Sequence, residues 1–151
     1  MKHSLLLFCL FFSGIGINFA QTFSSDAIIG TWLTGSQKAA VTVYKEGNKY
    51  FGKITWLKEP NEENGKAKLD DNNPDDKKKT VALMGLNLLK DFVFDGSTKW
   101  EKGIIYDPEN GKTYSCKITM ISNDKLDVRG FVGISMLGRT QTWIRIPNKG
   151  K

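Results

Sequence analysis

The stretch AIIGTWLTGSQKAAVTVYKEG, residues 27–47, opens with a glycine and a tryptophan two positions apart and then alternates apolar and polar side chains. Residues 28–34 are short and rich in side chains that favour strands, and residues 40–45 alternate as AVTVYK. A Gly47-Asn48 pair follows, after which residues 49–57 continue as KYFGKITWL. Two such runs around a Gly-Asn pair predict a β-hairpin.

Five further runs downstream have the same character: residues 90–95, 98–106, 112–121, 125–132 and 139–146. Most are separated by short turns such as DPENG at residues 107–111. About eight strands at regular spacing predict an all-β fold, a single antiparallel up-and-down barrel that leaves no exposed sheet edge. Only TVALMGLNLL, residues 80–89, offers a short helix, with an apolar loop as the alternative.

One long segment interrupts this pattern. Residues 58–79, KEPNEENGKAKLDDNNPDDKKK, contain two prolines, many Asn and Asp side chains and almost nothing apolar. Such a composition predicts a long polar loop. Its oxygen-rich DDNNPDD does not follow the EF-hand spacing, so we expect turn formation there and no bound metal.

The first twenty residues have the layout of a secretory signal peptide. A single lysine precedes an apolar run from Leu5 to Ile17, and the small residue Ala20 ends the segment. We therefore expect cleavage after residue 20, a barrel domain over residues 21–151, and export to the periplasm or beyond the cell. The apolar run is shorter than the roughly 20 residues of a membrane span, so we expect no stable membrane anchor.

Removing this segment would limit the available chemistry. It holds the one histidine, His3, and one of the two cysteines, Cys9, which leaves Cys116 alone. Histidine-dependent nucleophilic catalysis and zinc sites both need an imidazole, so we expect no enzyme activity, no cofactor and no metal. One of the 22 basic residues and none of the 16 acidic ones is lost, and the resulting charge of +5 is dispersed. Nucleic-acid binding needs a concentrated basic face and is not expected.

Strand alternation predicts an interior rich in aromatic side chains, which can line a ligand cavity or fill a solid core. The candidate cavity wall consists of Tyr50, Trp56, Trp100, Tyr106, Tyr114 and Met120. The first functional hypothesis is therefore a binding protein for a small, partly apolar ligand held inside the barrel. The alternative is a protein-interaction module with a filled core that acts through its loops or an edge.

Seven blocks of the chain, in this order, resemble an exported bacterial family. They are GTWLT (30–34), VYKEGNKYFGKITWLKEP (43–60), DDNNPD (70–75), LMGLNLL (83–89), WEKGIIYDPENGKTYSCKI (100–118), VRGFVG (128–133) and LGRTQTWIR (137–145). The family is domain-of-unknown-function family 2147. The resemblance implies a secreted or periplasmic lipocalin-like barrel with no assigned reaction.

The glycine and tryptophan of the opening stretch are also similar to the signature of lipocalins and related calycin barrels. In those proteins the tryptophan packs at the closed end of the barrel beneath an arginine from the last strand. The resemblance implies structural roles for Gly30, Trp32 and Arg145, with Arg139 as the other candidate arginine. A planar guanidinium stacks well on an indole ring and donates to nearby carbonyl groups.

Overall fold

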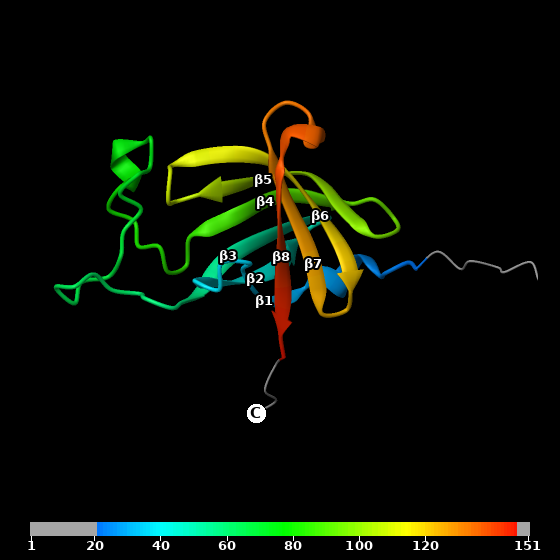
Figure 1. The fold of residues 1–151 in the computed structure, drawn as a ribbon, viewed down its shortest axis with the longest axis horizontal. Coiled ribbons are helices and arrows are strands. Elements are labelled where there is room, and N and C mark those ends of the chain that lie inside the picture. The colour runs from blue at the N-terminus through cyan, green and yellow to red at the C-terminus, as the bar shows by residue number, and fades with distance from the viewer. Residues whose placement is uncertain (1–20, 148–151) are drawn as a thin grey trace, which may run out of the picture.

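Eight antiparallel strands form a closed barrel in the computed structural model, which describes residues 21–147 (Figure 1). Each strand pairs with its neighbours in sequence, and β8 returns to pair with β1. The predicted all-β up-and-down barrel is confirmed. The strands are β1 (Gly30–Leu33), β2 (Ala39–Glu46), β3 (Lys49–Leu57), β4 (Asn87–Phe94), β5 (Lys99–Asp107), β6 (Lys112–Ser122), β7 (Lys125–Phe131) and β8 (Arg139–Ile146).

The hairpin predicted around Gly47 forms between β2 and β3. Glu46 pairs with Lys49, and Gly47 has a φ of 61°, a value that suits glycine in a two-residue turn. The opening stretch also contains β1, where Trp32 pairs with Arg145 of β8. The segment that suggested the fold therefore contributes both a tight hairpin and the seam that closes the barrel.

The short helix considered for residues 80–89 does not form. Gly85 has a φ of 89°, outside the helical range, and residues 87–89 already belong to β4. Helical structure in the described residues is confined to single 3-10 turns, η1 (Ser25–Ile28), η2 (Asp76–Lys78) and η3 (Ser135–Leu137). None of the helices within residues 21–147 has the length and apolar character needed to cross a membrane.

The barrel interior holds one continuous apolar core. Gly103 shows how closely it is packed, because a Cβ atom added there would lie 2.5 Å from the ring of Phe92. Sixteen buried side chains make up this core: Ile28, Trp32, Val41, Val43, Tyr50, Ile54, Leu88, Leu89, Phe92, Trp100, Cys116, Ile118, Met120, Leu126, Val128 and Trp143. In such a tightly packed interior even one added methyl group is expected to be felt.

The segment predicted to be a signal peptide, residues 1–20, lies outside the described residues, as do residues 148–151. The predicted cleavage after residue 20 and the predicted domain boundary at residue 21 therefore stay predictions. The strands of the barrel run from Gly30 to Ile146, so the predicted long loop at residues 58–79 lies within the region that connects β3 to β4.

Candidate functional site

The two ends of the barrel differ in how they are closed. At one end, η1 is held by two indole groups from the core. Trp32 donates from Nε1 to the carbonyl of Ile28 at 2.9 Å, and Trp100 donates from Nε1 to the carbonyl of Ser25 at 3.2 Å. Because both tryptophans are fully buried, η1 seals this closed end.

Arg145 completes the closed end. Its Cζ atom lies 4.0 Å from the centre of the Trp32 ring, and its nitrogens donate to the carbonyls of Ala27 at 2.6 Å, Ile29 at 3.0 Å and Asn123 at 2.6 Å. Burial lowers the pKa of the guanidinium. The three hydrogen bonds from this one guanidinium group to backbone carbonyls connect η1 to the β6–β7 turn. The role of Arg145 is therefore structural.

Gly30 is required by this arrangement. Its φ of 138° is one that side chains other than glycine rarely adopt, and a Cβ atom there would lie 2.6 Å from Nη1 of Arg145. The glycine and tryptophan of the opening stretch thus belong to one contact with Arg145. Arg139, the other candidate, is exposed at the opposite end of β8 and pairs with Gly130.

Three of the six candidate cavity residues, Tyr50, Trp100 and Met120, are buried near the closed end, each at 2 % exposure or less. The Tyr50 ring meets the Trp100 ring edge-on at 6.3 Å, and its hydroxyl donates to Asp26 at 2.8 Å. These three side chains fill the core in this structure.

The other three candidates lie at the opposite end of the barrel, which we call the open end. It carries the connections β1–β2, β3–β4, β5–β6 and β7–β8. Tyr106 and Tyr114 are half-buried, whereas Trp56 is 45 % exposed. The exposure of Trp56 differs from the inward burial that period-two alternation predicts. A bulge is the reason, since Val41 pairs with Ile54 while its neighbour Ala40 pairs with Trp56. The structure therefore does not bring all six residues around one cavity.

A buried carboxylate fixes the long loop between β3 and β4, residues 58–86, to the open end. Asp70 is fully buried, and it accepts hydrogen bonds from the Tyr106 hydroxyl at 2.7 Å and from Nδ2 of Asn73 at 2.6 Å. Burial, followed by the bond to Asp70, raises the pKa of Tyr106 to about 12. No ion pair within residues 21–147 involves Asp70, so hydrogen bonds alone stabilise its position.

A second contact holds the same loop against the β5–β6 turn. Nδ2 of Asn72 donates to the carbonyls of Pro108 and Glu109, each at 3.1 Å. Gly111 lies so close to the backbone of Asn72 that no larger residue fits there. The sequence predicts a polar loop around Asn72 and a separate turn at residues 107–111, and it does not predict their contact. The two turn-rich blocks, DDNNPD and DPENG, were visible, but nothing in the sequence shows that they meet.

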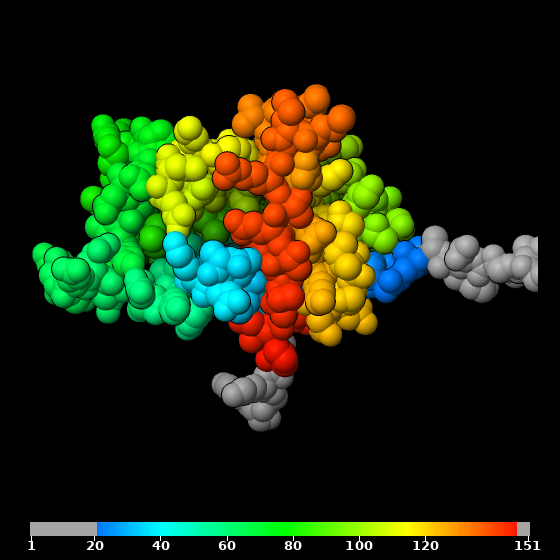
Figure 2. All heavy atoms as spheres, in the orientation of Figure 1, coloured from blue at the N-terminus to red at the C-terminus, as the bar shows by residue number. Residues whose placement is uncertain are grey.

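The loop between β7 and β8, residues 132–138, is the most apolar exposed feature of the open end. Val132, Ile134, Met136 and Leu137 are 70 %, 60 %, 83 % and 79 % exposed. The loop forms a lobe that projects from the barrel (orange in Figure 2). The sequence predicts a turn or bulge over residues 133–138 and places Val132 in the preceding strand, although three apolar residues fall within four positions there.

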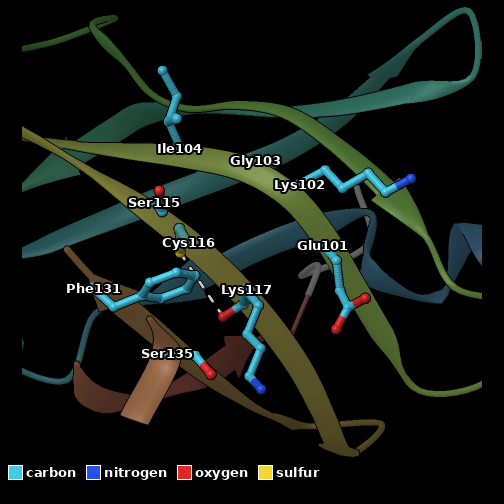
Figure 3. Close-up of a pocket in the computed structure, with 9 residues that line it drawn as sticks. All are labelled: Glu101, Lys102, Gly103, Ile104, Ser115, Cys116, Lys117, Phe131 and Ser135. Carbon is cyan, nitrogen blue, oxygen red and sulfur yellow. Dashed lines mark hydrogen bonds between the residues drawn. The ribbon is translucent and has the colours of Figure 1, made fainter. Parts of the chain in front are cut away.

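A shallow hollow of about 380 Å³ lies beside this loop, on the outer surface of β5, β6 and β7 (Figure 3). Ile104, Ser115, Lys117, Phe131 and Ser135 line it, and they alternate with side chains that point into the core. A second hollow, of about 310 Å³, lies at the closed end beside Lys45 and Tyr50. Neither hollow enters the barrel.

Cys116 forms part of the floor of the larger hollow but is 2 % exposed. Burial raises the pKa of its thiol to about 12, so the thiolate that a nucleophile needs is disfavoured at neutral pH. Among residues 21–147, no group of three or more His, Cys, Asp or Glu side chains is placed to hold a metal ion.

Comparisons with known proteins agree with this architecture. The chain is similar to a solved structure described as "Protein HP1028 from the human pathogen Helicobacter pylori belongs to the lipocalin family", with a TM-score of 0.71 and 22 % identity over 81 % of this chain and 84 % of that one. At that identity the likeness concerns the fold. No curated protein matches. The model of the family "Uncharacterized protein conserved in bacteria (DUF2147)" matches residues 30–145, and the chain therefore belongs to that family.

Proposed function

We propose that this protein is an exported binding module that acts through the loops at the open end of a filled barrel. The observation that carries the proposal is the contrast between the packed interior and the four exposed apolar side chains of the β7–β8 loop. An exposed apolar patch on an otherwise well-packed protein marks an interaction site. Export rests on the signal-like layout of residues 1–20.

Binding, and not catalysis, is part of the proposal. The sequence holds no histidine beyond His3, and the buried Cys116 thiol keeps its proton at neutral pH. The fully buried carboxylate of Asp70 is occupied by Tyr106 and Asn73. General acid–base chemistry needs a titrating group within reach of a substrate, and Asp70 is closed to solvent.

Site-specific photo-crosslinking in an exporting bacterium tests the proposal. A photoreactive amino acid placed at Met136 should give adducts of defined mass, because this side chain would touch the bound partner. The same amino acid at Ile121, an exposed apolar position on β6, is the matched control. Adducts at neither position, or equal adducts at both, would contradict a specific surface at the open end.

A second candidate function is binding of a small, partly apolar ligand, which the lipocalin-like fold favours. The hollow beside Phe131 has a volume of about 380 Å³, within the range of small-molecule sites. A ligand inside the barrel would instead require core side chains such as Trp100 to move. Native mass spectrometry before and after organic extraction separates the cases. A bound mass that disappears on extraction supports a ligand, and a bare chain in both samples argues against one.

A further inference from the structure

The β7–β8 loop concentrates apolar surface to a degree that the rest of the described chain does not match. Its four apolar side chains are at least 60 % exposed, whereas large apolar side chains elsewhere in residues 21–147 reach at most 48 %, at Ile121. The four fall within six consecutive positions on one projecting lobe (Figure 2). Isolated exposed apolar residues are normal, but such a cluster indicates contact with something apolar.

Three backbone carbonyls of this loop, those of Ile134, Ser135 and Met136, accept hydrogen bonds from the loop itself or from Arg129 of β7. Arg129 donates from Nε to the carbonyl of Ser135 at 2.6 Å and from Nη2 to that of Met136 at 3.2 Å. Within the loop, the N–H of Leu137 donates to Ile134 at 3.2 Å. Transfer of a backbone N–H or C=O group without a hydrogen-bond partner into an apolar medium costs free energy. Because three carbonyls of this loop already have partners, less free energy is lost when the loop leaves water.

The charged residues that flank the β7–β8 loop in the sequence are basic. From Val128 to Thr142 the sequence contains Arg129 and Arg139 and no acidic residue. Arg139, directly after the loop, is exposed, and Lys117 borders the adjoining hollow together with the carboxylate of Glu101. Cations beside an exposed apolar tip suit a negatively charged lipid surface, which attracts each basic residue near it.

The size of the loop also favours a lipid surface over a protein. A stable protein interface buries about 800 Å² on each partner, which a loop of seven residues does not provide by itself. A membrane interface needs only that a few apolar side chains enter the boundary between headgroups and acyl chains.

We propose that the β7–β8 loop, residues 132–138, docks this protein reversibly onto an anionic lipid surface. This inference rests on the proposed function, because it names the partner of the same open-end surface. The apolar side chains of Met136 and Leu137 enter the interface, and Arg139 faces the headgroups. Arg129 stabilises the loop through its hydrogen bonds to the carbonyls of Ser135 and Met136. Docking of this kind requires no membrane-spanning segment.

Vesicle flotation tests the proposal with the protein as the cell processes it. Intact mass spectrometry establishes the N-terminus of this protein, so that an effect of residues 1–20 on lipid binding is recognised. Wild-type protein should float with vesicles that contain phosphatidylglycerol, and added salt should weaken binding. Pure phosphatidylcholine vesicles should retain much less. The double variant Met136→Ser/Leu137→Ser should bind about tenfold more weakly or worse. Ile121→Ser, the control, should bind as the wild type does.

Two further measurements keep the result interpretable. Thermal melts should match for all variants, because the changed side chains are exposed, and Leu137→Trp should show a blue-shifted emission only with anionic vesicles. No flotation of the wild type, equal flotation of the double variant, or equal binding to both lipids would overturn the proposal. Vesicle binding that fails while Met136 still crosslinks to a protein rejects the lipid partner alone. Failure of both rejects the open-end function as well.

Discussion

The guanidinium group of Arg145 lies over the indole ring of Trp32, with its Cζ atom 4.0 Å from the ring centre. The two residues are directly opposite each other across the seam between β1 and β8. The stacked pair therefore lies on the seam where β1 and β8 close the barrel, and Arg145 also holds η1 and the residue after it through hydrogen bonds to the carbonyls of Ala27 and Ile29. This relationship makes the most conspicuous motif of the sequence a structural one.

Truncating the tryptophan should damage the fold. Trp32→Ala should lower the free energy of unfolding by about 3–5 kcal/mol, because a fully buried aromatic side chain is lost and a cavity remains. Urea denaturation monitored by circular dichroism measures the change. Unaltered stability together with lost binding would assign Trp32 to a ligand site instead.

Replacing the arginine tests the carbonyl bonds. Arg145→Lys keeps the charge but cannot reach the three carbonyls of Ala27, Ile29 and Asn123 with one planar group. We expect a loss of about 2 kcal/mol in the free energy of unfolding, since charge-assisted hydrogen bonds to these carbonyls are lost. Arg139→Lys is the matched control and should change stability by less than about 0.5 kcal/mol. Equal effects of the two substitutions would refute the assignment.

The glycine of β5 reports on the packing of the interior. Gly103→Ala should cost about 1–3 kcal/mol, because the new methyl group would overlap the Phe92 ring. Gly130→Ala is the control, since a Cβ atom there meets its neighbours at 3.4 Å or more. Phe92→Leu should recover part of the loss in the Gly103→Ala background. If Gly103→Ala is as mild as the control, the interior is looser than this structure describes.

Sequence patterning predicted the strands well because each is a local property. The runs from residues 49–57 and 139–146 match β3 and β8 at both ends, and the register of the β2–β3 hairpin follows from Gly47-Asn48. The start of β4 was placed three residues late, at Lys90 instead of Asn87. Near its start Leu88 and Leu89 are consecutive apolar residues without alternation, and such a run does not distinguish a buried strand from a helix or loop.

The candidate site was harder to predict, for a physical reason. Alternation gives the face of a side chain but not its depth in the barrel, so it grouped Tyr50 near the closed end with Tyr114 near the open end. It also cannot register a bulge, which is why Trp56 is exposed. The contact between Asp70 and Tyr106 joins positions 36 residues apart, and no local pattern encodes such a pairing.

The buried carboxylate should hold the long loop in place. Tyr106→Phe removes one of the two side-chain donors to Asp70, and we expect a loss of about 1–3 kcal/mol, since a buried acceptor is left short of a partner. Hydrogen exchange should become faster at the bridge between Leu69 and Ala82. Tyr44→Phe, which removes a hydroxyl that donates to neutral Asn87, should cost less. Unchanged exchange in the loop would show that Asp70 does not hold it.

Stability should fall in alkaline solution because the fold raises the pKa of Cys116 and of Tyr106. Burial raises the pKa of Cys116 from 9.0 to about 12 and that of Tyr106 from 10.0 to about 12. Between the ordinary and the raised values, the unfolded chain has released protons that the native chain retains. The unfolded state then binds fewer protons, so the free energy of unfolding decreases as pH rises. At neutral pH and below, these two groups contribute almost no slope to the dependence of stability on pH.

Variants separate the two contributions to this alkaline loss. Urea midpoints measured across the alkaline range should fall less steeply for Cys116→Ala from about pH 9 upward, and for Tyr106→Phe from about pH 10 upward. Both variants start from a lower stability at neutral pH. The informative quantity is therefore the slope of the urea midpoint against pH, and not the midpoint itself. Lysines and the other tyrosines titrate equally in all three proteins and cancel in the comparison. Parallel slopes for wild type and variants would mean that neither proton is retained by burial.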